Sequence, residues 1–453
     1  MGQVRVREAA ARCLMEIHSG KAFVATAVDR WIESTLQDAD PRDKALFTHL
    51  VYTALTHESA IAYRIDHVSK RPVRSMKPYI AATLEIAAAQ IFYDDRIPDR
   101  AAIHEAVELV KHSPMQSLSG FVNGVLRAVV RAEDTLEWPK DPIERMTVLY
   151  GLPDSLIREW TAAYGAEQAE DLCRRLDSDT ALTVRCNTLK DSPAHVLEEL
   201  EQTIGKDQVH PSAYSSWMFR LGTGADLKHW PLITEGRLVV QNESAALAAL
   251  LTLARPGMRV LDLCAAPGGK STLMAQMMED QGQIISADLY PQKVERIRRQ
   301  AELMGIQCIE AVQQDGTQVR EDWAGAFDVV LVDAPCSGWG IVRNKPDIRL
   351  HRSEKDHGDL EALQRELLDR AQAYVRPGGR LVYSTCTMRP GENEEQTRWF
   401  STNYPQFQST DLQKDLPILS LCDTIMDDHG GLVVLPEPGG LDGFYMAAWQ
   451  KKE

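Results

Sequence analysis

The chain has 453 residues, 44% of them hydrophobic and 25% charged, which is the balance of a globular protein with two or three domains. Its formal net charge of −15 argues against a protein that coats nucleic acid without selectivity, because phosphate affinity comes from clustered Lys and Arg. The sequence holds no apolar run of membrane-spanning length and opens without the apolar core of a secretory signal. We therefore expect a cytoplasmic protein with no membrane partner.

Residues 1–138 predict an all-α domain, because apolar residues recur at spacings of three and four and no strand-like alternation occurs. The clearest helical stretches are 6–17, 45–57, 79–93 and 101–112. The breaks between them carry Pro or Asp, which end or cap helices. The N-terminal part of the chain is therefore expected to be a bundle of consecutive helices.

Two stretches of this acidic chain are locally basic. Residues 64–77 hold five Lys or Arg against one Asp, and Arg343, Lys345, Arg349 and Arg352 form a second cluster. Charge runs of this kind are either solvated surface or contacts for phosphate groups. For the first stretch both interpretations stay open.

Residues 139–235 predict a small mixed α/β domain that connects the helical domain to the rest of the chain. The β-branched run 181–189 indicates a strand, and 192–204 is amphipathic with Ser192 placed as the N-cap of a helix. Two more helices are expected ahead of them, at 153–165 and 166–177.

From residue 236 onward strands and helices alternate, which calls for a parallel, doubly wound sheet with right-handed crossovers. Residues 430–450 differ, because two apolar runs flank a glycine-rich turn and so predict an antiparallel hairpin at the sheet edge. Residues 236–453 are thus expected to form a Rossmann-like domain. Its expected strands are 259–264, 283–289, 308–314, 327–333 and 379–385, and its expected helices are 269–279, 291–304, 359–375 and 392–404.

The first strand of this domain runs into a glycine-rich turn in the sequence VLDLCAAPGGKST. Gly268 and Gly269 permit a tight turn and a close backbone approach to a nucleotide-like ligand. Asp288 follows Gly268 by 20 residues, near the spacing of an acid that binds ribose hydroxyls. Asp315, after the third strand, is placed either to meet an adenine amino group or simply to make a turn. A P-loop is disfavoured, because that motif needs a glycine where this chain has Cys264.

The eight cysteines form no C-x-x-C pair and no zinc-like cluster, so we expect reduced thiols and no metal site. Cys336, in VVLVDAPCSGWG, and Cys386, in GRLVYSTC, each follow a predicted strand. Neighbouring parallel strands end at one edge of a sheet, so both thiols are expected to meet there, with Asp333 in the same crevice. Polar and glycine-rich loops flank both cysteines, unlike a cysteine that serves as a small core hydrophobe.

Two thiols beside a bound methyl donor suit methylation at carbon 5 of cytosine. Carbon 5 is not nucleophilic in the resting base, but a thiolate that adds to carbon 6 makes it an enamine-like nucleophile that takes a methyl group from a sulfonium. An acid near N3 would support charge on the ring, the role expected for Asp333. A second thiol could assist when the first is expelled.

In these motifs the chain resembles the RsmB (Sun) group of RNA cytosine-C5 methyltransferases. DLCAAPGGKS, DAPCSG and YSTC occur in order, with KPDIR after the first cysteine and GENEE after the second. The stretch RIPDRAAIHEAVELVKHSPMQSLSGFVNGVLRAV is similar to the NusB-like RNA-binding domain of this group. The resemblance implies a class I methyltransferase fold and an action on RNA, with 16S rRNA as the first candidate. We also expect a monomer with no DNA partner.

The resemblance also implies the roles of individual residues. Cys386 would be the nucleophile, and Cys336 would assist release of the 5-methylcytosine product. S-adenosylmethionine would be held by the glycine-rich turn and by three acids at strand ends: Cys264, Ala265, Ala266, Pro267, Gly268, Gly269 and Lys270, with Asp288, Asp315 and Asp333. Two alternatives stay open, namely a tRNA cytosine as substrate, and an RNA-binding or antitermination-type factor with a vestigial methyltransferase domain.

Overall fold

The computed structural model describes residues 3–222, 230–351 and 354–453. The chain separates into two compact units. The first consists of Met1–Asp177 with Val342–His351, and the second of Ser178–Ile341 with Arg352–Glu453. Within the described ranges, none of the helices combines the length and apolarity needed to cross a bilayer.

The first unit contains helices and no strand in its described residues, as predicted. Local signals set their ends: Asp40 accepts a hydrogen bond from the Arg42 N–H, and Pro41 occupies the first turn of the helix that follows. The α-helices are α1 (Gln3–His18), α2 (Val24–Ser34), α3 (Pro41–Thr56), α4 (Glu58–Val68), α5 (Pro78–Tyr93), α6 (Asp99–Lys111), α7 (Ser119–Ala132), α8 (Pro142–Tyr150), α9 (Asp154–Tyr164), α10 (Ala166–Leu176) and α16 (Asp347–His351). Short 3-10 turns lie at Val73–Ser75, Gln116–Leu118 and Glu133–Thr135.

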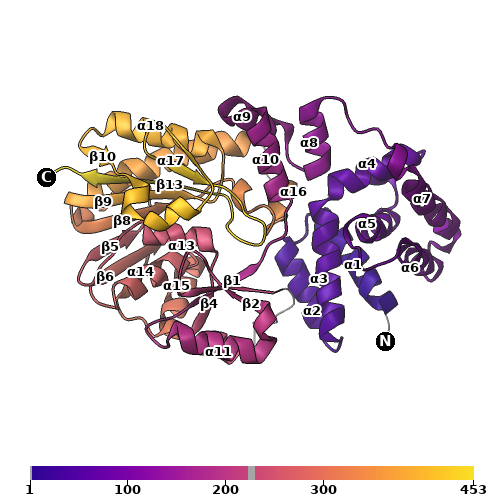
Figure 1. Ribbon diagram of the computed structural model, residues 1–453, viewed down its shortest axis with the longest axis horizontal. Helices are drawn as coiled ribbons and strands as arrows, with labels where there is room; N and C mark the ends of the chain where they lie inside the picture. Colours follow the sequence, from indigo (N-terminus) through magenta and orange to yellow (C-terminus); the bar gives the residue numbers. More distant parts are fainter. Residues whose placement is uncertain (1–2, 223–229, 352–353) are drawn as a thin grey trace. The chain divides into compact units, whose positions relative to one another are not determined.

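Helix α5 forms the centre of this unit. Its residues are mostly apolar on every side, and Leu84, Ile86 and Ala88 are buried together with the polar Glu85 and Gln90. A helix without a polar face is stable only when other helices surround it. Accordingly α1, α3, α6 and α7 all pack against α5 (Figure 1).

A short segment from far along the chain completes the helical unit. Asp347 Oδ1 accepts a hydrogen bond of 2.6 Å from the Val24 N–H, and Leu350 packs against the helical core. The second basic cluster is therefore only partly a surface feature: Arg343 and two guanidinium nitrogens of Arg349 are buried, whereas Lys345 is exposed. Arg352, the last member of that cluster, lies outside the described residues.

The second unit begins with a four-stranded antiparallel sheet in the order β2-β3-β1-β4. Helix α11 (Pro193–Ile204) packs against it through Val196 and Leu200. The Ser192 side chain accepts from the His195 N–H, which confirms Ser192 as the N-cap. The strands are β1 (Leu182–Cys186), β2 (Val209–Pro211), β3 (Met218–Leu221) and β4 (Leu238–Val240), with α12 (Pro231–Thr234) and a 3-10 turn at Lys206–Gln208.

The larger sheet has nine strands in the order β11-β12-β13-β9-β8-β5-β6-β7, and β10 pairs with β13. The strands are β5 (Arg259–Asp262), β6 (Gln283–Asp288), β7 (Ile309–Gln313), β8 (Phe327–Asp333), β9 (Val375–Thr385), β10 (Phe407–Ser409), β11 (Thr424–Met426), β12 (Leu432–Val434) and β13 (Phe444–Lys451). Its helices are α13 (Glu243–Leu250), α14 (Gly269–Met277), α15 (Pro291–Met304), α17 (Glu354–Tyr374), α18 (Glu394–Asn403) and α19 (Leu412–Asp415), with 3-10 turns at Glu321–Trp323, Trp339–Ile341, Pro390–Glu392 and Pro417–Leu421.

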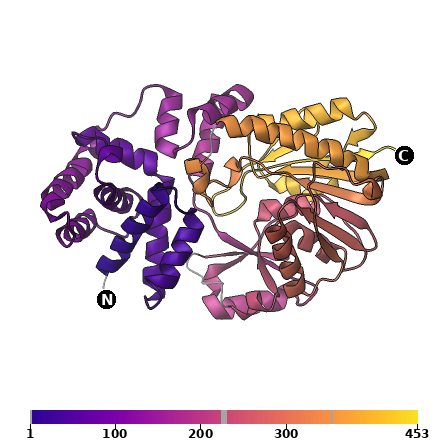
Figure 2. The ribbon, with the colours of Figure 1, turned by 180° about the vertical axis from the view of Figure 1, so that it is seen from behind.

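Strands β5 to β9 are parallel, as the alternating pattern predicted. Helix α17 packs against β8 and β9, and α15 against β6 and β7 (Figure 2). The register brings Asp333 of β8 opposite Ser384 of β9, and Asp288 of β6 opposite Gln313 of β7. The strands therefore end close together at one edge, where ligands of such sheets bind.

The C-terminal antiparallel pair is present, but it lies deeper in the sheet than a simple edge hairpin. Strand β13 pairs with β12 on one side and with β9 on the other, and β11 extends the sheet beyond β12. Boundaries at residues 138 and 235 stay a prediction. The compact helical unit continues to Asp177, because α8, α9 and α10 pack with one another and α8 packs on α4.

Candidate active site

The two cysteines expected to meet lie side by side. Cys336 Sγ and Cys386 Sγ are 3.2 Å apart, although 50 residues separate them in the chain. Cys386 directly follows β9, and Cys336 follows the neighbouring parallel strand β8. Both side chains are half-buried, so a reactant can approach them. Five other cysteines are buried and are typical core residues: Cys13, Cys173, Cys186, Cys308 and Cys422.

The Asp333 carboxylate is held from two sides beside these thiols. Lys270 Nζ donates to Asp333 Oδ2 at 2.6 Å, and Ser384 Oγ donates to Oδ1 at 2.8 Å. Burial opposes the charge on Lys270, but Asp333 outweighs it, with a smaller contribution from Cys386, so the pKa of Lys270 is raised. A positive charge is thereby maintained near Cys386, where it favours a thiolate. From the sequence, Lys270 was expected only to bind the cofactor, and its contact with Asp333 was not predicted.

The glycine-rich turn connects β5 to α14 and has the shape predicted for a ligand loop. Gly268 adopts φ +106° immediately before the helix, a conformation that strains any residue with a Cβ. The Ala265 N–H donates to Ala287 O at 2.8 Å, which ties the turn to β6. The first N–H groups of α14 are thus presented beside the ends of the strands, as in nucleotide-binding turns.

Asp262, at the end of β5, adds a polar group that suits a charged ligand. Its Oδ2 accepts from Ser271 Oγ at 2.6 Å, while its buried Oδ1 has no hydrogen-bond partner within the described part of the chain. Burial raises the pKa of Asp262 to about 7. An ammonium group such as that of S-adenosylmethionine would satisfy the orphaned oxygen, so the turn fits this cofactor. Sequence reasoning missed Asp262, although it stands inside the motif.

Asp288 is the last residue of β6, and Asp315 lies two residues after β7, so both stand at the ends of parallel strands as predicted. Asp288 is 7% exposed and accepts from the Tyr290 N–H at 3.2 Å. Asp315 Oδ1 accepts from both the N–H and the Oγ1 of Thr317, at 3.0 and 2.7 Å, so one of its oxygens shapes a turn. Ribose and adenine contacts for these two acids stay predictions.

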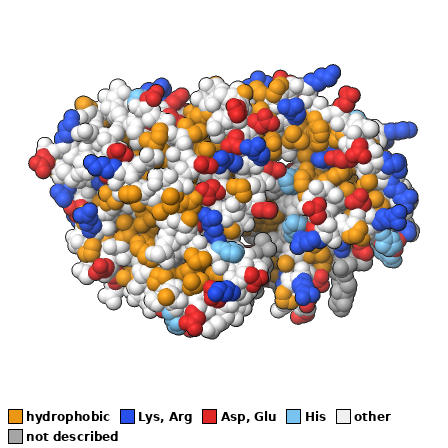
Figure 3. Space-filling view, viewed as in Figure 1, with side chains coloured by type: hydrophobic (Ala, Val, Ile, Leu, Met, Phe, Trp, Pro, Cys, Tyr) orange, Lys and Arg blue, Asp and Glu red, His pale blue; other side chains and the backbone are white. Residues whose placement is uncertain are grey.

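The basic stretch 64–77 divides into one structural residue and four exposed ones. Arg64 donates to Glu133 and to Tyr93 Oη and lies between the Phe92 and Trp138 rings. The exposed members are Lys70, Arg71, Arg74 and Lys77. Figure 3 shows Lys and Arg side chains gathered on the face of the helical unit that lies at the right of the view. The acidic chain therefore has a locally basic surface that suits phosphate contacts.

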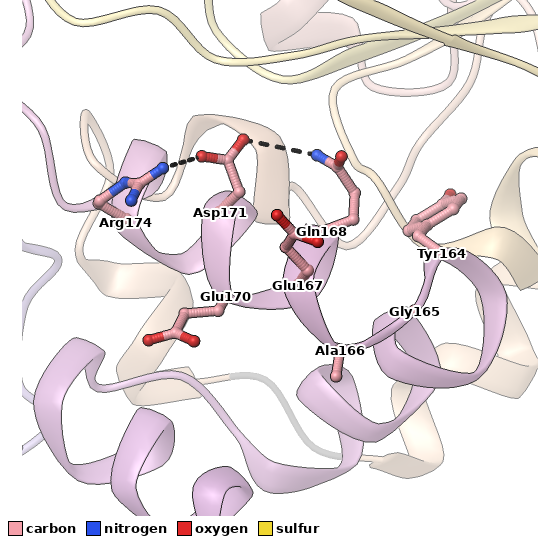
Figure 4. Close-up of a pocket in the computed structure, with 8 residues that line it drawn as sticks. All are labelled: Tyr164, Gly165, Ala166, Glu167, Gln168, Glu170, Asp171 and Arg174. Atoms are coloured by element: carbon pink, nitrogen blue, oxygen red, sulfur yellow. Dashed lines mark hydrogen bonds and ion pairs between the residues drawn. The ribbon is translucent and has the colours of Figure 1, made fainter.

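A separate pocket lies in the helical unit and contains none of the predicted site residues. It is lined by residues of α9 and α10 and of the turn between them (Figure 4). Asp171 pairs with Arg174 and accepts from Gln168 at 3.5 Å, so its charge is balanced within the pocket. This arrangement indicates a structural helix–helix junction.

Comparison with protein families assigns most of the chain in three parts. Residues 249–450 match the family described as 16S rRNA methyltransferase RsmB/F. Residues 4–131 match the NusB family, and residues 152–227 match the ferredoxin-like domain of RsmF/B-like methyltransferases. The order agrees with the helical, small α/β and Rossmann-like domains predicted from the sequence.

Individual relatives extend over the full length. The chain is 33% identical over 455 residues to a Bacillus subtilis (strain 168) protein named probable ribosomal RNA small subunit methyltransferase B, and 100% of both chains is covered. The crystal structure of PH0851 has the same fold, with a TM-score of 0.80 at 24% identity over 100% of this chain and 99% of that one. A methyltransferase homologue from Pyrococcus horikoshii gives a TM-score of 0.58 at 23% identity, over 69% of this chain and 98% of that one.

Proposed function

This chain belongs to the RsmB/F family of 16S rRNA methyltransferases, and we propose that it methylates carbon 5 of one cytosine in 16S rRNA through a covalent adduct with Cys386. The family makes it an RNA methyltransferase that uses S-adenosylmethionine. The observation that carries the finer proposal is the 3.2 Å approach of Cys336 Sγ and Cys386 Sγ, next to Lys270 and Asp333.

Cys386 is the proposed nucleophile. Its sulfur adds to carbon 6 of the cytosine, and the electrons of the 5,6 double bond move toward carbon 5 and N3. Lys270 favours the thiolate by its charge, and Asp333, fixed by Lys270 and Ser384, is placed to support N3 as the ring becomes electron-rich. Bound S-adenosylmethionine supplies the electrophilic methyl group that carbon 5 accepts.

Cys336 is proposed to assist release. After methylation, carbon 5 loses its proton, and the electrons of that C–H bond restore the 5,6 double bond. The bond between carbon 6 and Cys386 Sγ breaks at the same time, its electrons leave on the sulfur, and the proton lost from carbon 5 is taken up by the pair of cysteines. The Cys336 sulfur lies 3.2 Å from the sulfur that leaves. The pKa of Cys336 is raised, first by its hydrogen bond with Cys386 and then by burial, so Cys336 is the protonated member of the pair.

The residues proposed to hold the cofactor are the turn from Cys264 to Lys270 and the acids after the strands. Asp262 Oδ1 and the first N–H groups of α14 offer an acceptor and donors for its amino-acid end. Asp288 is proposed for the ribose hydroxyls and Asp315 for the adenine amino group.

RNA binding is proposed to involve the helical unit. Lys70, Arg71, Arg74 and Lys77 are exposed and can contact phosphates, which would position the RNA without reading its sequence. The target cytosine must leave its stack or lie in a loop before a thiol can reach carbon 6.

The experiment is a pair of cysteine variants with a buried cysteine as the control. Cys386→Ala should abolish transfer of a labelled methyl group to RNA, whereas Cys336→Ala should accumulate an RNA–protein adduct that survives a denaturing gel. Cys308→Ala, at a buried site, should retain methyl transfer and should accumulate no adduct. Turnover by Cys386→Ala would reject the nucleophile, and the lack of a retarded band for Cys336→Ala would reject the release role.

The RNA class needs its own measurement. Purified 16S rRNA and bulk tRNA, each incubated with the enzyme and S-adenosylmethionine, can be compared by bisulfite sequencing. A single cytosine of 16S rRNA that resists bisulfite conversion supports the proposal. Resistance found only in tRNA would mean that the same reaction takes place on tRNA instead. Absence of S-adenosylmethionine binding in calorimetry would instead support a vestigial domain.

A further inference from the structure

Glu392 holds the loop that carries Cys336. Its carboxylate is fully buried, and Oε2 accepts from the Ser337 N–H at 2.8 Å, directly after Cys336. Oε2 also accepts from Gln364 Nε2 at 2.9 Å, and the same Gln364 nitrogen donates to Pro335 O at 2.9 Å, directly before Cys336. The backbone on both sides of this cysteine is therefore fixed by one connected set of hydrogen bonds.

Asn393, the next residue, holds the loop that carries Cys386 in the same manner. Its Oδ1 accepts from Thr385 Oγ1 at 2.6 Å, before the cysteine. Its Nδ2 donates to Thr387 O at 3.0 Å, after the cysteine. Asn393 is 0% exposed, so water cannot replace these bonds without a change in structure.

The two loops are also joined to each other. Ser337 Oγ and Thr387 Oγ1 are 2.9 Å apart, and each belongs to the residue that follows a cysteine. The Gly340 N–H donates to Cys386 O at 3.0 Å. A displacement of either loop would therefore change the distance between the sulfurs.

The buried charge of Glu392 has a partner that does not depend on the cysteines. Arg389 lies 3.2 Å from Glu392 Oε1 and also 3.5 Å from Glu361. Arg389 thus offsets the cost of burying the Glu392 carboxylate. If Glu392 is replaced by an uncharged residue, Arg389 still has Glu361 as an ion-pair partner. Glu392 adds to the hydrogen bond with Cys386 and to burial in raising the pKa of Cys336, so it also helps to keep that thiol protonated.

We propose that Glu392 and Asn393 are positioning residues, each dedicated to one thiol: Glu392 holds Cys336 for release, and Asn393 holds Cys386 for attack. This inference rests on the proposed roles of the two cysteines. It assigns opposite consequences to two adjacent buried residues, which a general contribution to folding would not produce.

The test is the adduct on a denaturing gel, measured with 16S rRNA and S-adenosylmethionine. Glu392→Ala should accumulate adduct, as Cys336→Ala does, while multiple-turnover kcat falls on the order of 100-fold, the cost of a misplaced reacting group. Asn393→Ala should form no adduct, even when combined with Cys336→Ala, and its single-turnover rate should fall by a similar factor. Cofactor affinity, measured by calorimetry, should stay within about twofold in both variants.

Conservative variants separate positioning from folding. Glu392→Gln keeps an oxygen for the Ser337 N–H and leaves Arg389 paired with Glu361, so release should recover most of its rate. If Glu392→Ala does not fold, Gln364→Leu can replace it. This variant removes the hydrogen bonds from Gln364 to Pro335 O and Glu392 Oε2 and should also accumulate adduct. Matched controls are Glu243→Ala and Asn187→Ala, which remove buried polar groups bonded to Arg220 and to two backbone carbonyls elsewhere. They should lower the melting temperature without changing the adduct pattern.

The outcomes are distinct. Adduct with Cys336→Ala, together with normal release by folded Glu392→Ala and Gln364→Leu, overturns this inference and leaves the proposed function intact. Adduct formation by folded Asn393→Ala overturns the second half of it. Absence of adduct with Cys336→Ala itself rejects the release role in the proposed function.

Discussion

Asp347 Oδ1 accepts a 2.6 Å hydrogen bond from the Val24 N–H, across 323 residues of chain. Val24 is the first residue of α2, whose N-cap residue, Phe23, provides no side-chain acceptor of its own. A carboxylate at this position satisfies an unpaired N–H and interacts favourably with the helix dipole. Asp347 therefore acts as the cap of a helix that lies far from it in sequence.

The Asp347→Ala variant should destabilise the helical unit by about 1 kcal/mol, the usual effect of a lost cap. Thermal unfolding followed by circular dichroism measures this change. Asp347→Asn keeps an acceptor oxygen and should lose less than half as much. Equal losses in the two variants would mean that charge, and not the hydrogen bond, provides the stabilisation.

Gly340 should not tolerate a side chain. A Cβ at this position would lie 1.9 Å from Gly443 O and 2.9 Å from Cys386 O, both of them backbone atoms. Gly340→Ala should therefore displace the backbone beside Cys386 and lower methyl transfer on the order of 100-fold. Gly124→Ala, in α7, is the matched control because its Cβ would meet nothing within 4 Å. It should leave activity unchanged and stabilise the protein by up to about 1 kcal/mol.

Glu85 should make the helical unit less stable as the pH rises. It is 6% exposed in α5, and burial, followed by the charge of Glu58, raises its pKa from 4.5 to about 8. The native state retains this proton up to about pH 8, whereas the unfolded chain loses it above about pH 4.5. The contribution of Glu85 to stability is therefore complete below about pH 4.5 and is lost as the pH rises to about 8.

Glu85→Gln removes this titration. Its free energy of unfolding relative to the wild type should increase between pH 5 and pH 8, by more than ~1 kcal/mol. Urea unfolding at a series of pH values measures the difference. Glu144→Gln, at an exposed position, should give a curve parallel to the wild type. A parallel curve for Glu85→Gln as well would show that the residue is ionised in the folded state.

Lys270→Met should slow the reaction of Cys386 with iodoacetamide. The substitution removes the positive charge near the thiol and leaves Asp333 without its 2.6 Å partner, and both changes disfavour a thiolate. In a Cys336→Ala background, alkylation of Cys386 near neutral pH should fall on the order of tenfold. Peptide mass spectrometry identifies the labelled cysteine, and labelling of the denatured protein gives the intrinsic rate. An unchanged ratio of native to denatured rates would exclude Lys270 as the activating charge.

Residue patterns predicted the parts of this protein that depend on strand order. Cys336 and Cys386 were expected to meet because each follows a strand of a parallel sheet, and adjacent β8 and β9 place them 3.2 Å apart. Ser192 was recognisable as a helix cap because a cap requires only local spacing. Such features follow from the chain's local geometry and from the rule that parallel strands end at one edge.

Features that depend on distant burial were not predictable in this way. Arg343 and Arg349 looked like a basic surface, yet their segment packs within the helical unit, and nothing in its composition indicates what covers it. Glu392 and Asn393 looked like polar residues at the start of a helix. Their proposed role in positioning the two cysteines depends on hydrogen bonds to Ser337, Thr385 and Thr387, and these residues come close only in the folded protein.

The placement of 342–351 also limits how this protein can be divided. A fragment that starts at Ser178 would retain Leu350 and Asp347 but lose the helices that they contact. In that fragment Asp347 and Leu350 would be left in solvent, 11 and 14 positions after Cys336. The methyltransferase domain is therefore not expected to be stable when it is expressed alone. Fusion proteins that contain its nine-stranded sheet should also include the N-terminal helices.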